Sequence, residues 1–381
     1  MANPQENVSD DTNNGDESGQ LENNKAINEA LCLLETQSSN TNTELINLPK
    51  DICTPEKTPE LSRNVSPAIP NTVSPLNNHE VHQPSEELYI NQLHKCAKQI
   101  DKGRFGKVYS VTIKNPREIR MAVKRIPFRT DENSRLSTYF ELSTMEMIGS
   151  GKTPYIVAYY CSLIDVKTSE LCICMELMDT SIAKFYQAMH RFFLPELSPE
   201  KLNRFVQRCA YNVVRALDFL KSKNIVHRDV KPLNILINKD GNIKLCDFGI
   251  CRNLTDRQLD SDAVIGTGMY LPPESEKCAI QGDMWALGIS LIEIIAGKHP
   301  FAEYESYGLG FKILEWEPIF PTTVSILAQA FILRLLRKEA SERPRSYMDV
   351  INDSFICNMT EIPSDDEIDF IQHVIKKTNK L

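Results

Sequence analysis

The sequence predicts an α+β fold in which a group of strands comes first and a group of helices follows. Apolar and β-branched runs indicate strands over residues 94–128, 156–165 and 171–176. Apolar residues at helical spacing indicate helices over residues 131–148, 209–224 and 282–295. With 381 residues and 41% apolar content, the chain is long enough to bury a core of about 260 residues.

Residues 1–88 differ in composition from the rest of the chain. They contain no Phe, Trp or Tyr and are rich in Asn, Ser, Thr and Pro. They carry 15 acidic and four basic side chains, a net charge of −11, whereas the whole chain carries −8 and the remainder is therefore +3. Such a segment buries too little apolar surface to offset its ordering entropy, so we predict a disordered, acidic regulatory leader.

A glycine-bearing turn between two strands is the first motif that carries chemistry. The run CAKQIDKGRFGKVYSV, residues 96–111, has glycines at 103 and 106 and a valine at 108. It fits the phosphate-covering pattern G-x-G-x-x-G-x-V only if Asp101 takes the first glycine place. Glycines let backbone approach phosphates without a side chain in the way. A carboxylate at 101 stands near a polyanion, so we expect it to weaken nucleotide affinity without abolishing activity.

The next strand, MAVKRI at residues 121–126, contains a single lysine in an apolar run. Lys124 lies 18 residues after Gly106 and 17 before Glu141. Glu141 belongs to a predicted helix in which Leu142, Met145 and Ile148 share one face. This spacing is that of a phosphate-gripping lysine paired to a helix glutamate.

The most specific motif is the run IVHRDVKPLNILI at residues 225–237. It places Asp229, Lys231 and Asn234 at offsets 0, 2 and 5. In phosphoryl-transfer sites of this pattern the aspartate orients the substrate hydroxyl, the lysine faces the transferred phosphate and the asparagine holds magnesium. The strand KLCDFGI follows, and Asp247 lies 18 residues after Asp229, where it can chelate Mg²⁺ that bridges nucleotide phosphates.

Together these motifs resemble the eukaryotic protein kinase family over residues 94–357. The segments ICMELMDTSIAKFY (173–186) and KTPYIVAYY (152–160), with AVKRI, HRDVKPLN and LCDFGI, are similar to the MAP kinase kinase subfamily. The resemblance implies a bilobal kinase fold, with a small β-rich N-lobe over 94–176 and a large helical C-lobe over 177–357.

The resemblance also implies an activity and its partners. The enzyme would use ATP and Mg²⁺ to phosphorylate Ser/Thr and Tyr in the activation loop of a downstream MAP kinase, and an upstream MAP kinase kinase kinase would activate it. The nucleotide-binding positions that the family pattern implies are Ile100, Gly103, Gly106, Val108, Ala122, Lys124, Glu141, Met175, Glu176 and Met178. Among them Met175 would be the gatekeeper, and adenine would bond to backbone near Glu176 and Met178. Two further positions have structural roles in the family: Asp283 would brace the HRD backbone, and Arg343 would pair with Glu274.

Regulation is expected in residues 250–274, the segment that follows DFG at 247–249 and ends with PPE at 272–274. Arg228 provides a buried cation that a loop phosphate would neutralise, which would order the loop. The subfamily usually has two phosphorylation sites here, but this chain has Arg257 at the first place and Ser261 at the second. We therefore expect control through Ser261 alone, with Thr255 as a weaker candidate.

The remaining features bound the location of the protein. The tail, residues 358–381, contains an amphipathic run at 365–377 that is either a docking helix for upstream kinases or a helix packed on the large lobe. The polar N-terminus and the lack of an 18-residue apolar run predict no membrane association, and the charge pattern predicts no nucleic acid binding. Eleven scattered cysteines are typical of a reduced compartment, so we expect cytoplasmic and, as an open alternative, nuclear localisation.

Three functions are compatible with these observations. An active MAP kinase kinase is favoured because Lys124, Glu141, Asp229, Asn234 and Asp247 are all present. A pseudokinase scaffold is motivated by Asp101 and the missing first phosphorylation site. A Ser/Thr-only kinase of another pathway is the third possibility.

Overall fold

The computed structural model describes residues 91, 93–95, 97–102, 106–114, 118–128, 132–148, 151–194, 197–253, 268–274, 280–303 and 309–381. The chain divides into two units, Met1–Tyr89 and Ile90–Leu381, and all described residues belong to the second. The predicted leader, Gly103 and Ser261 lie outside the described residues.

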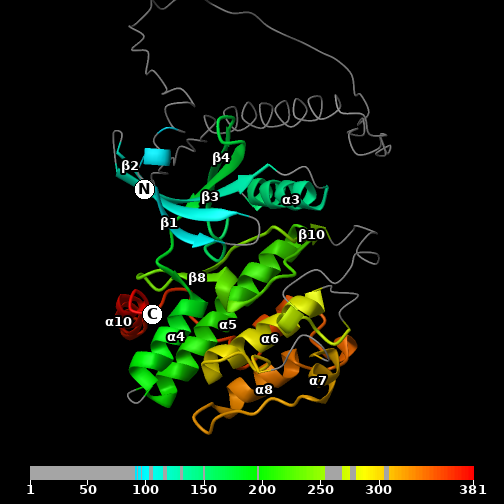
Figure 1. Cartoon of the computed structure of the whole chain (residues 1–381). Coiled ribbons are helices and arrows are strands. Elements are labelled where there is room, and N and C mark those ends of the chain that lie inside the picture. Colours follow the sequence, from blue (N-terminus) through cyan, green and yellow to red (C-terminus); the bar gives the residue numbers. More distant parts are fainter. Residues whose placement is uncertain are drawn as a thin grey trace, which may run out of the picture. The chain divides into compact units, whose positions relative to one another are not determined.

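The first part of the described unit is a five-stranded antiparallel sheet that carries helix α3 (Figure 1). The sheet has the order β1-β2-β3-β5-β4, so β4 is at one edge. The strands are β1 (Ala97–Lys102), β2 (Lys107–Lys114), β3 (Glu118–Pro127), β4 (Tyr159–Asp165) and β5 (Glu170–Glu176). Helix α3 (Glu132–Ile148) buries Leu142, Met145 and Ile148, which confirms the face predicted from their spacing.

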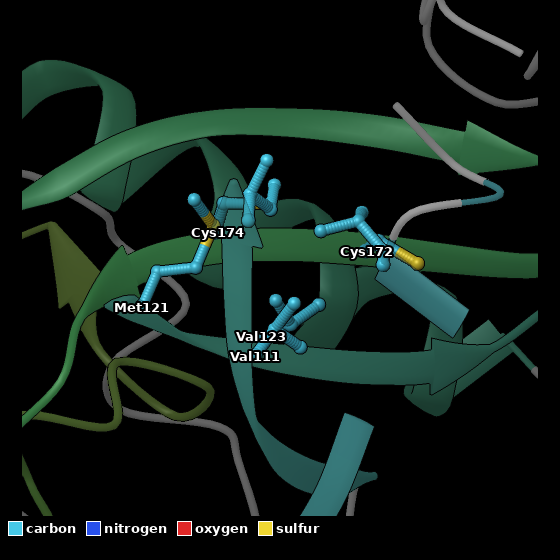
Figure 2. Packing of buried hydrophobic residues seen from close by; sticks show 7 residues of the cluster. Val111, Met121, Val123, Cys172 and Cys174 are labelled. Atoms are coloured by element: carbon cyan, nitrogen blue, oxygen red, sulfur yellow. The ribbon is translucent and has the colours of Figure 1, made fainter. Parts of the chain in front are cut away.

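The strand register sorts side chains onto the two faces of this sheet. Val108 lies opposite Lys124, and Ala122 lies opposite Met175, so these four residues share one face. Figure 2 shows the buried cluster on the other face, which comprises Leu93, Val111, Ile113, Met121, Val123, Cys172 and Cys174. One face is therefore a dry core, and the other carries the lysine of the candidate site.

The second part is mainly helical. Its helices are α4 (Ile182–Phe193), α5 (Pro199–Ser222), α6 (Ile280–Ala296), α7 (Leu309–Glu315), α8 (Ile326–Leu335), α9 (Tyr347–Ile351) and α10 (Asp365–Thr378). Its short strands are β6 (Thr180–Ser181), β7 (Ile225–Val226), β8 (Ile235–Ile237), β9 (Ile243–Leu245) and β10 (Arg252–Asn253). Among the described residues, 3₁₀ turns cover Pro232–Asn234, Gly268–Tyr270 and Ala340–Glu342. The predicted strand-rich and helix-rich parts are thus both confirmed.

Helix α5 begins ten residues earlier than the prediction of 209–224. Ser198 accepts a hydrogen bond from the Lys201 amide, and Pro199 occupies the first turn. A serine cap followed by proline is a strong start signal, because the cap satisfies a free amide and proline has no amide to satisfy. Leu202, Phe205 and Val206 then continue the buried face of the helix.

The tail helix α10 packs on the large lobe (Figure 1). Ile371 and Val374 are buried, and the Phe370 ring meets the rings of Phe185 and Phe205 edge-on, at 6.2 Å between centroids in each case. Burying each apolar side chain of this size contributes about 2 kcal/mol. Of the two alternatives for this helix, the structure therefore favours packing on its own lobe.

A charged contact fixes the same helix at its first turn. Arg208, which is 1% exposed, donates from Nε to Oε1 and from Nη2 to Oε2 of Glu367, both at 3.0 Å. The Arg208 guanidinium also donates to the Thr360 carbonyl, and Arg204 Nε lies 3.2 Å from Glu367 Oε1. We call Arg204, Arg208 and Glu367 the tail clamp.

Another buried ion pair anchors the end of the activation segment. Arg343 donates from Nη1 and Nη2 to the two carboxylate oxygens of Glu274, at 2.5 and 2.8 Å, as the family pattern implied. Its guanidinium also stacks on Trp285, 5.1 Å from the ring centroid. Among the described residues, no helix is both long and apolar enough to cross a membrane.

Candidate active site

The run 225–237 forms a tight loop that gathers its polar side chains. Lys231 Nζ lies 2.6 Å from Asp229 Oδ2, and the Asn234 amide nitrogen donates to the same oxygen at 2.8 Å. A second bond from Asn234 reaches the Asp229 carbonyl at 2.9 Å. Asn234 is buried at the end of a 3₁₀ turn, while Asp229 and Lys231 remain partly exposed. The loop therefore presents one carboxylate whose orientation is fixed from two sides.

The backbone of this loop is held by Asp283 of α6. Its two carboxylate oxygens accept from the amides of His227 at 2.9 Å and Arg228 at 2.7 Å. Arg228 has φ of 67°, a left-handed conformation that costs a non-glycine residue about 1 kcal/mol or more. Burial raises the pKa of the Asp283 carboxyl, although both amide bonds favour its charged form. The expected bracing role of Asp283 is thus confirmed.

An ionic cluster joins the sheet to the helical part. Lys124 Nζ lies 2.5 Å from Glu141 Oε1 on α3 and 2.9 Å from Asp247 Oδ1, which follows β9. We call Lys124, Glu141 and Asp247 the active-site cluster. Because Lys124 and Asp247 are 123 residues apart, this contact brings the two predicted motifs into one site.

Burial and pairing act in opposite directions on these three groups. Burial disfavours the ammonium charge of Lys124, but the carboxylates of Asp247 and Glu141 outweigh it and hold its pKa above the ordinary value. Burial raises the pKa of Glu141, and Lys124 offsets this only in part. For Asp247, burial acts upward but Lys124 outweighs it, so its pKa is lowered. Asp247 is therefore held as a carboxylate, ready to meet a cation.

The residues around Asp247 hold it in an unusual conformation. Its φ is 65°, and the neighbouring Phe248 ring is buried against His227, 5.4 Å between ring centroids. The His227 ring also bonds to the Cys246 carbonyl at 3.1 Å. A strained backbone held by buried neighbours on both sides is typical of a functional position.

The phosphate-covering turn is described only at its flanks. A side chain at Gly106 would place Cβ 2.3 Å from the Arg125 carbonyl oxygen, so β3 itself requires glycine there. Ile100 lies at the irregularity of β1 and is 39% exposed, whereas Val108 faces the Lys124 side of the sheet. Asp101 pairs with Val108 in register and is exposed, and its carboxylate accepts from the Lys102 amide at 2.8 Å.

The segment after β5 links the sheet to the helical part. The Glu176 amide donates to the Ala158 carbonyl at 2.9 Å, while its carboxylate accepts from Lys244 of β9 at 2.7 Å. Met178 is buried and Met175 is half-buried on the Lys124 face. Lys244 is not among the residues predicted from the sequence, although its alternation with buried Ile243 and Leu245 places it on the opposite side of β9.

The oxygen atoms near Asp247 suit a hard divalent cation. The Asn234 amide nitrogen is committed to Asp229, which leaves its carbonyl oxygen turned the other way. A carboxylate and an amide oxygen are the ligand types that Mg²⁺ prefers, with substrate phosphates completing the coordination. The residues present therefore fit the metal that the sequence motifs imply.

Comparison with known proteins agrees with this geometry. The family model described as "Protein kinase domain" matches residues 94–356. The dual specificity mitogen-activated protein kinase kinase sek-1 of Caenorhabditis elegans is 35% identical over 258 residues, which cover 65% of this chain and 74% of sek-1. The chain belongs to the protein kinase family, in its MAP kinase kinase group.

Two further relatives share the same domain. Protein kinase wis1 of Schizosaccharomyces pombe is 32% identical over 65% of this chain and 40% of its own length. MAP kinase kinase mkk-4 of C. elegans is 37% identical over 54% of this chain and 56% of its own. As a protein kinase, the chain uses ATP with a divalent metal ion.

Proposed function

We propose that this protein kinase transfers the γ-phosphate of ATP to Ser/Thr and Tyr side chains in the activation loop of a MAP kinase. The observation that carries the proposal is that the loop with Asp229, Lys231 and Asn234 is bonded to the segment leading into Asp247 of the active-site cluster, since the Cys246 amide donates to the Asn234 backbone carbonyl at 2.9 Å. The printed name of sek-1, a dual specificity kinase, supports the two acceptor types. Lys231 supports the Ser/Thr part, because it is typical of Ser/Thr or dual catalytic loops.

Asp229 is the residue that would act on the acceptor hydroxyl. Its carboxylate is partly exposed and is oriented by Lys231 at 2.6 Å and Asn234 at 2.8 Å. It would accept the proton of the incoming hydroxyl as the oxygen attacks phosphorus, a contribution of about 10²- to 10⁴-fold in rate. Lys231 would then lie beside the transferred phosphoryl group and balance its charge.

The active-site cluster would hold the nucleotide. Lys124 would contact the phosphates, and Glu141 fixes its ammonium at 2.5 Å so that little ordering is left to binding. Asp247 and Asn234 would hold Mg²⁺, which neutralises charge on the phosphate oxygens. The adenine base would be surrounded by apolar side chains, those of Ile100, Val108, Ala122, Met175 and Met178. Gly103 and Gly106 would lie in the turn over the phosphates.

Regulation would act through the catalytic loop. Nε and Nη1 of Arg228 are buried and have no hydrogen-bond partner within the described part of the chain. A buried cation in this state favours an anion nearby, since leaving its donors unsatisfied costs about 1–3 kcal/mol. Phosphate on Ser261, added by a MAP kinase kinase kinase, would be that anion. We place this regulation in the cytoplasm, with the nucleus as a second site of action.

The test is phosphate transfer from radiolabelled ATP with Mg²⁺ to a panel of kinase-dead MAP kinases. The proteins compared are Ser261→Asp, Ser261→Asp with Asp229→Ala, and wild type treated with an upstream kinase. We expect label on Thr and Tyr of one panel member, reduced at least about 10³-fold by Asp229→Ala.

Each other outcome assigns a different function. Label on Ser or Thr without Tyr would replace the proposal with a Ser/Thr-only kinase. If neither the Ser261→Asp protein nor the upstream-activated wild type shows phosphate transfer that requires Asp229, the protein is a scaffold. Activation that persists in Ser261→Ala would refute control through a single site.

A further inference from the structure

Two cysteines face each other across the edge of the five-stranded sheet. Cys161 of β4 is the register partner of Cys174 of β5 in an antiparallel pair. Directly opposed residues point to the same face, and Cys174 belongs to the buried cluster that Figure 2 shows, while Cys161 packs against that cluster. Cys174 is 1% exposed, whereas Cys161 is half-buried on the outermost strand.

The spacing of such a pair suits a covalent bond. Opposed residues in antiparallel strands have Cα atoms about 4.5–5.5 Å apart, within the range of about 4.4–6.8 Å that disulfides span. We propose that Cys161 and Cys174 form a dithiol site that a peroxide oxidises to a disulfide between β4 and β5. This site has no part in phosphate transfer, and it lies one residue before Met175.

The two thiols differ in the way that such a reaction needs. A hydrogen bond from the Cys174 thiol lowers the pKa of Cys161, although burial opposes this. The same contact, with burial, raises the pKa of Cys174. Cys161 is also the more accessible of the two, so it would provide the attacking thiolate and Cys174 would resolve the product.

The chemical steps balance with hydrogen peroxide as oxidant. The Cys161 sulfur attacks one peroxide oxygen, the O–O bond breaks, and one water leaves with the thiol proton, which gives a sulfenic acid. The Cys174 sulfur then attacks the Cys161 sulfur, and the S–O bond breaks. A second water leaves with the Cys174 proton. Two thiols have lost two electrons, and the peroxide has gained them.

Cys172 is the competing partner and serves as an internal test. It lies on the same face as Cys174, two residues earlier on β5, but its register partner is Leu163. It is therefore diagonal to Cys161, and diagonal neighbours lie about 7–8 Å apart. That separation exceeds the range of an unstrained disulfide.

The experiment oxidises the folded 381-residue chain with equimolar hydrogen peroxide and then alkylates the remaining thiols. Trypsin cuts after Lys152, Lys167 and Lys184, so Cys161 lies in one peptide and both Cys172 and Cys174 lie in the next. Mass spectrometry without reduction should show these two peptides joined, with two thiols lost from the eleven cysteines. Cys172→Ala and Cys174→Ala proteins decide which partner is used.

We expect the joined peptide in wild type and in Cys172→Ala, and its loss in Cys174→Ala and Cys161→Ser. A joined peptide that persists in Cys174→Ala and disappears in Cys172→Ala would overturn the pairing. If Cys161 is recovered as an alkylated thiol or as a sulfinic acid, with no joined peptide, the proposed dithiol site is refuted. Urea-unfolded protein oxidised in parallel provides the random pairing against which the folded result is judged. None of these readouts depends on kinase activity.

Discussion

The active-site cluster sets one ammonium against two carboxylates, whereas the tail clamp sets two guanidinium groups against one carboxylate. In the active-site cluster, Glu141 Oε2 is buried and has no hydrogen-bond partner among the residues the structure describes. In the tail clamp, Glu367 Oε1 accepts from Arg208 Nε at 3.0 Å, while Oε2 accepts from Arg208 Nη2 and the Ser364 amide, each at 3.0 Å. The first cluster has spare acceptor capacity and the second is saturated.

This difference distinguishes an ionic cluster that binds a ligand from one that stabilises the fold. Burial raises the pKa of Glu141 more than Lys124 lowers it. A further cation near the active-site cluster would therefore stabilise the charged form of Glu141. Burial also opposes the charge on Glu367, but Arg208 and the Ser364 amide outweigh it and lower its pKa to about 2. Saturated ionic contacts of this kind stabilise the fold. Removing one partner destabilises it, because the other partner is left as an uncompensated buried charge.

The largest expected effect follows from removing one carboxylate of the active-site cluster. Asp247→Asn should lower phosphate transfer about 10³-fold, or about 4 kcal/mol, because the metal loses its charged ligand. The melting temperature should stay equal or rise, since the change removes a negative charge beside buried Glu141. Kinase assays and calorimetry test both parts, with Asp240→Asn, in an exposed turn, as the control. A large fall in melting temperature would show that both clusters are structural.

Arg208→Met tests the opposite prediction for the tail clamp. It removes both guanidinium bonds of Arg208 from Glu367, which keeps only Arg204 and the Ser364 amide, and it removes the Arg208 donor from the Thr360 carbonyl. We therefore expect a loss of about 3 kcal/mol in unfolding free energy. Activity per folded molecule should be unchanged. Chemical denaturation of this variant and of Arg345→Met, which changes an exposed arginine, gives the comparison. Lost activity at unchanged stability would mean that the clamp acts on catalysis.

Acid sensitivity should sharpen the contrast. The unfolded chain protonates Glu367 near its ordinary value of 4.5, whereas the folded protein keeps it charged down to about pH 2. The stabilisation is therefore complete above about pH 4.5 and is lost as the pH falls toward 2. A pKa lowered from 4.5 to about 2 corresponds to about 3 kcal/mol, which solvent screening at this partly exposed carboxylate reduces to about 2 kcal/mol. Glu367→Gln should be less stable than wild type at pH 7 and should approach it near pH 2. Denaturation midpoints over this range measure it, and a constant difference would contradict the assignment.

The sequence predicted the site better than the boundaries of the fold. Short motifs such as HRDVKPLN specify Asp229, Lys231 and Asn234 together, and the structure brings them within hydrogen-bond distance. Their meeting with Lys124 depends on how the two lobes pack, and for that contact the family resemblance was needed in addition to residue patterns.

Two features of the fold, the start of α5 and the surface that α10 meets, do not follow from the apolar pattern of the sequence. The predicted start of α5 is ten residues late because apolar spacing alone does not mark a helix start, whereas the cap at Ser198 and Pro199 does. The fate of α10 stayed open because an amphipathic helix looks the same whether its apolar face meets its own lobe or a partner. Only the surface it meets, with Phe185 and Arg208, distinguishes the two.

The smallest expected effect concerns a third negative charge on the active-site side. Asp101 pairs in register with Val108, on the face that carries Lys124, and its charge is among the causes that raise the pKa of Cys246, after burial. Its carboxylate is exposed and bonded to the Lys102 amide, so solvent screens most of its repulsion toward nucleotide phosphates. Asp101→Gly should lower the KM for ATP about two- to threefold, equivalent to about 0.5 kcal/mol.

A second variant separates charge from backbone freedom at this position. Asp101→Asn keeps a side-chain oxygen for the Lys102 amide and removes the charge, whereas glycine also loosens the strand by about 0.5–1 kcal/mol. If charge is the cause, both variants should lower the KM alike, and the difference from wild type should shrink at high salt. An effect confined to glycine, unchanged by salt, would assign it to flexibility of the turn. An unchanged or raised KM in both would remove Asp101 from the account of nucleotide affinity.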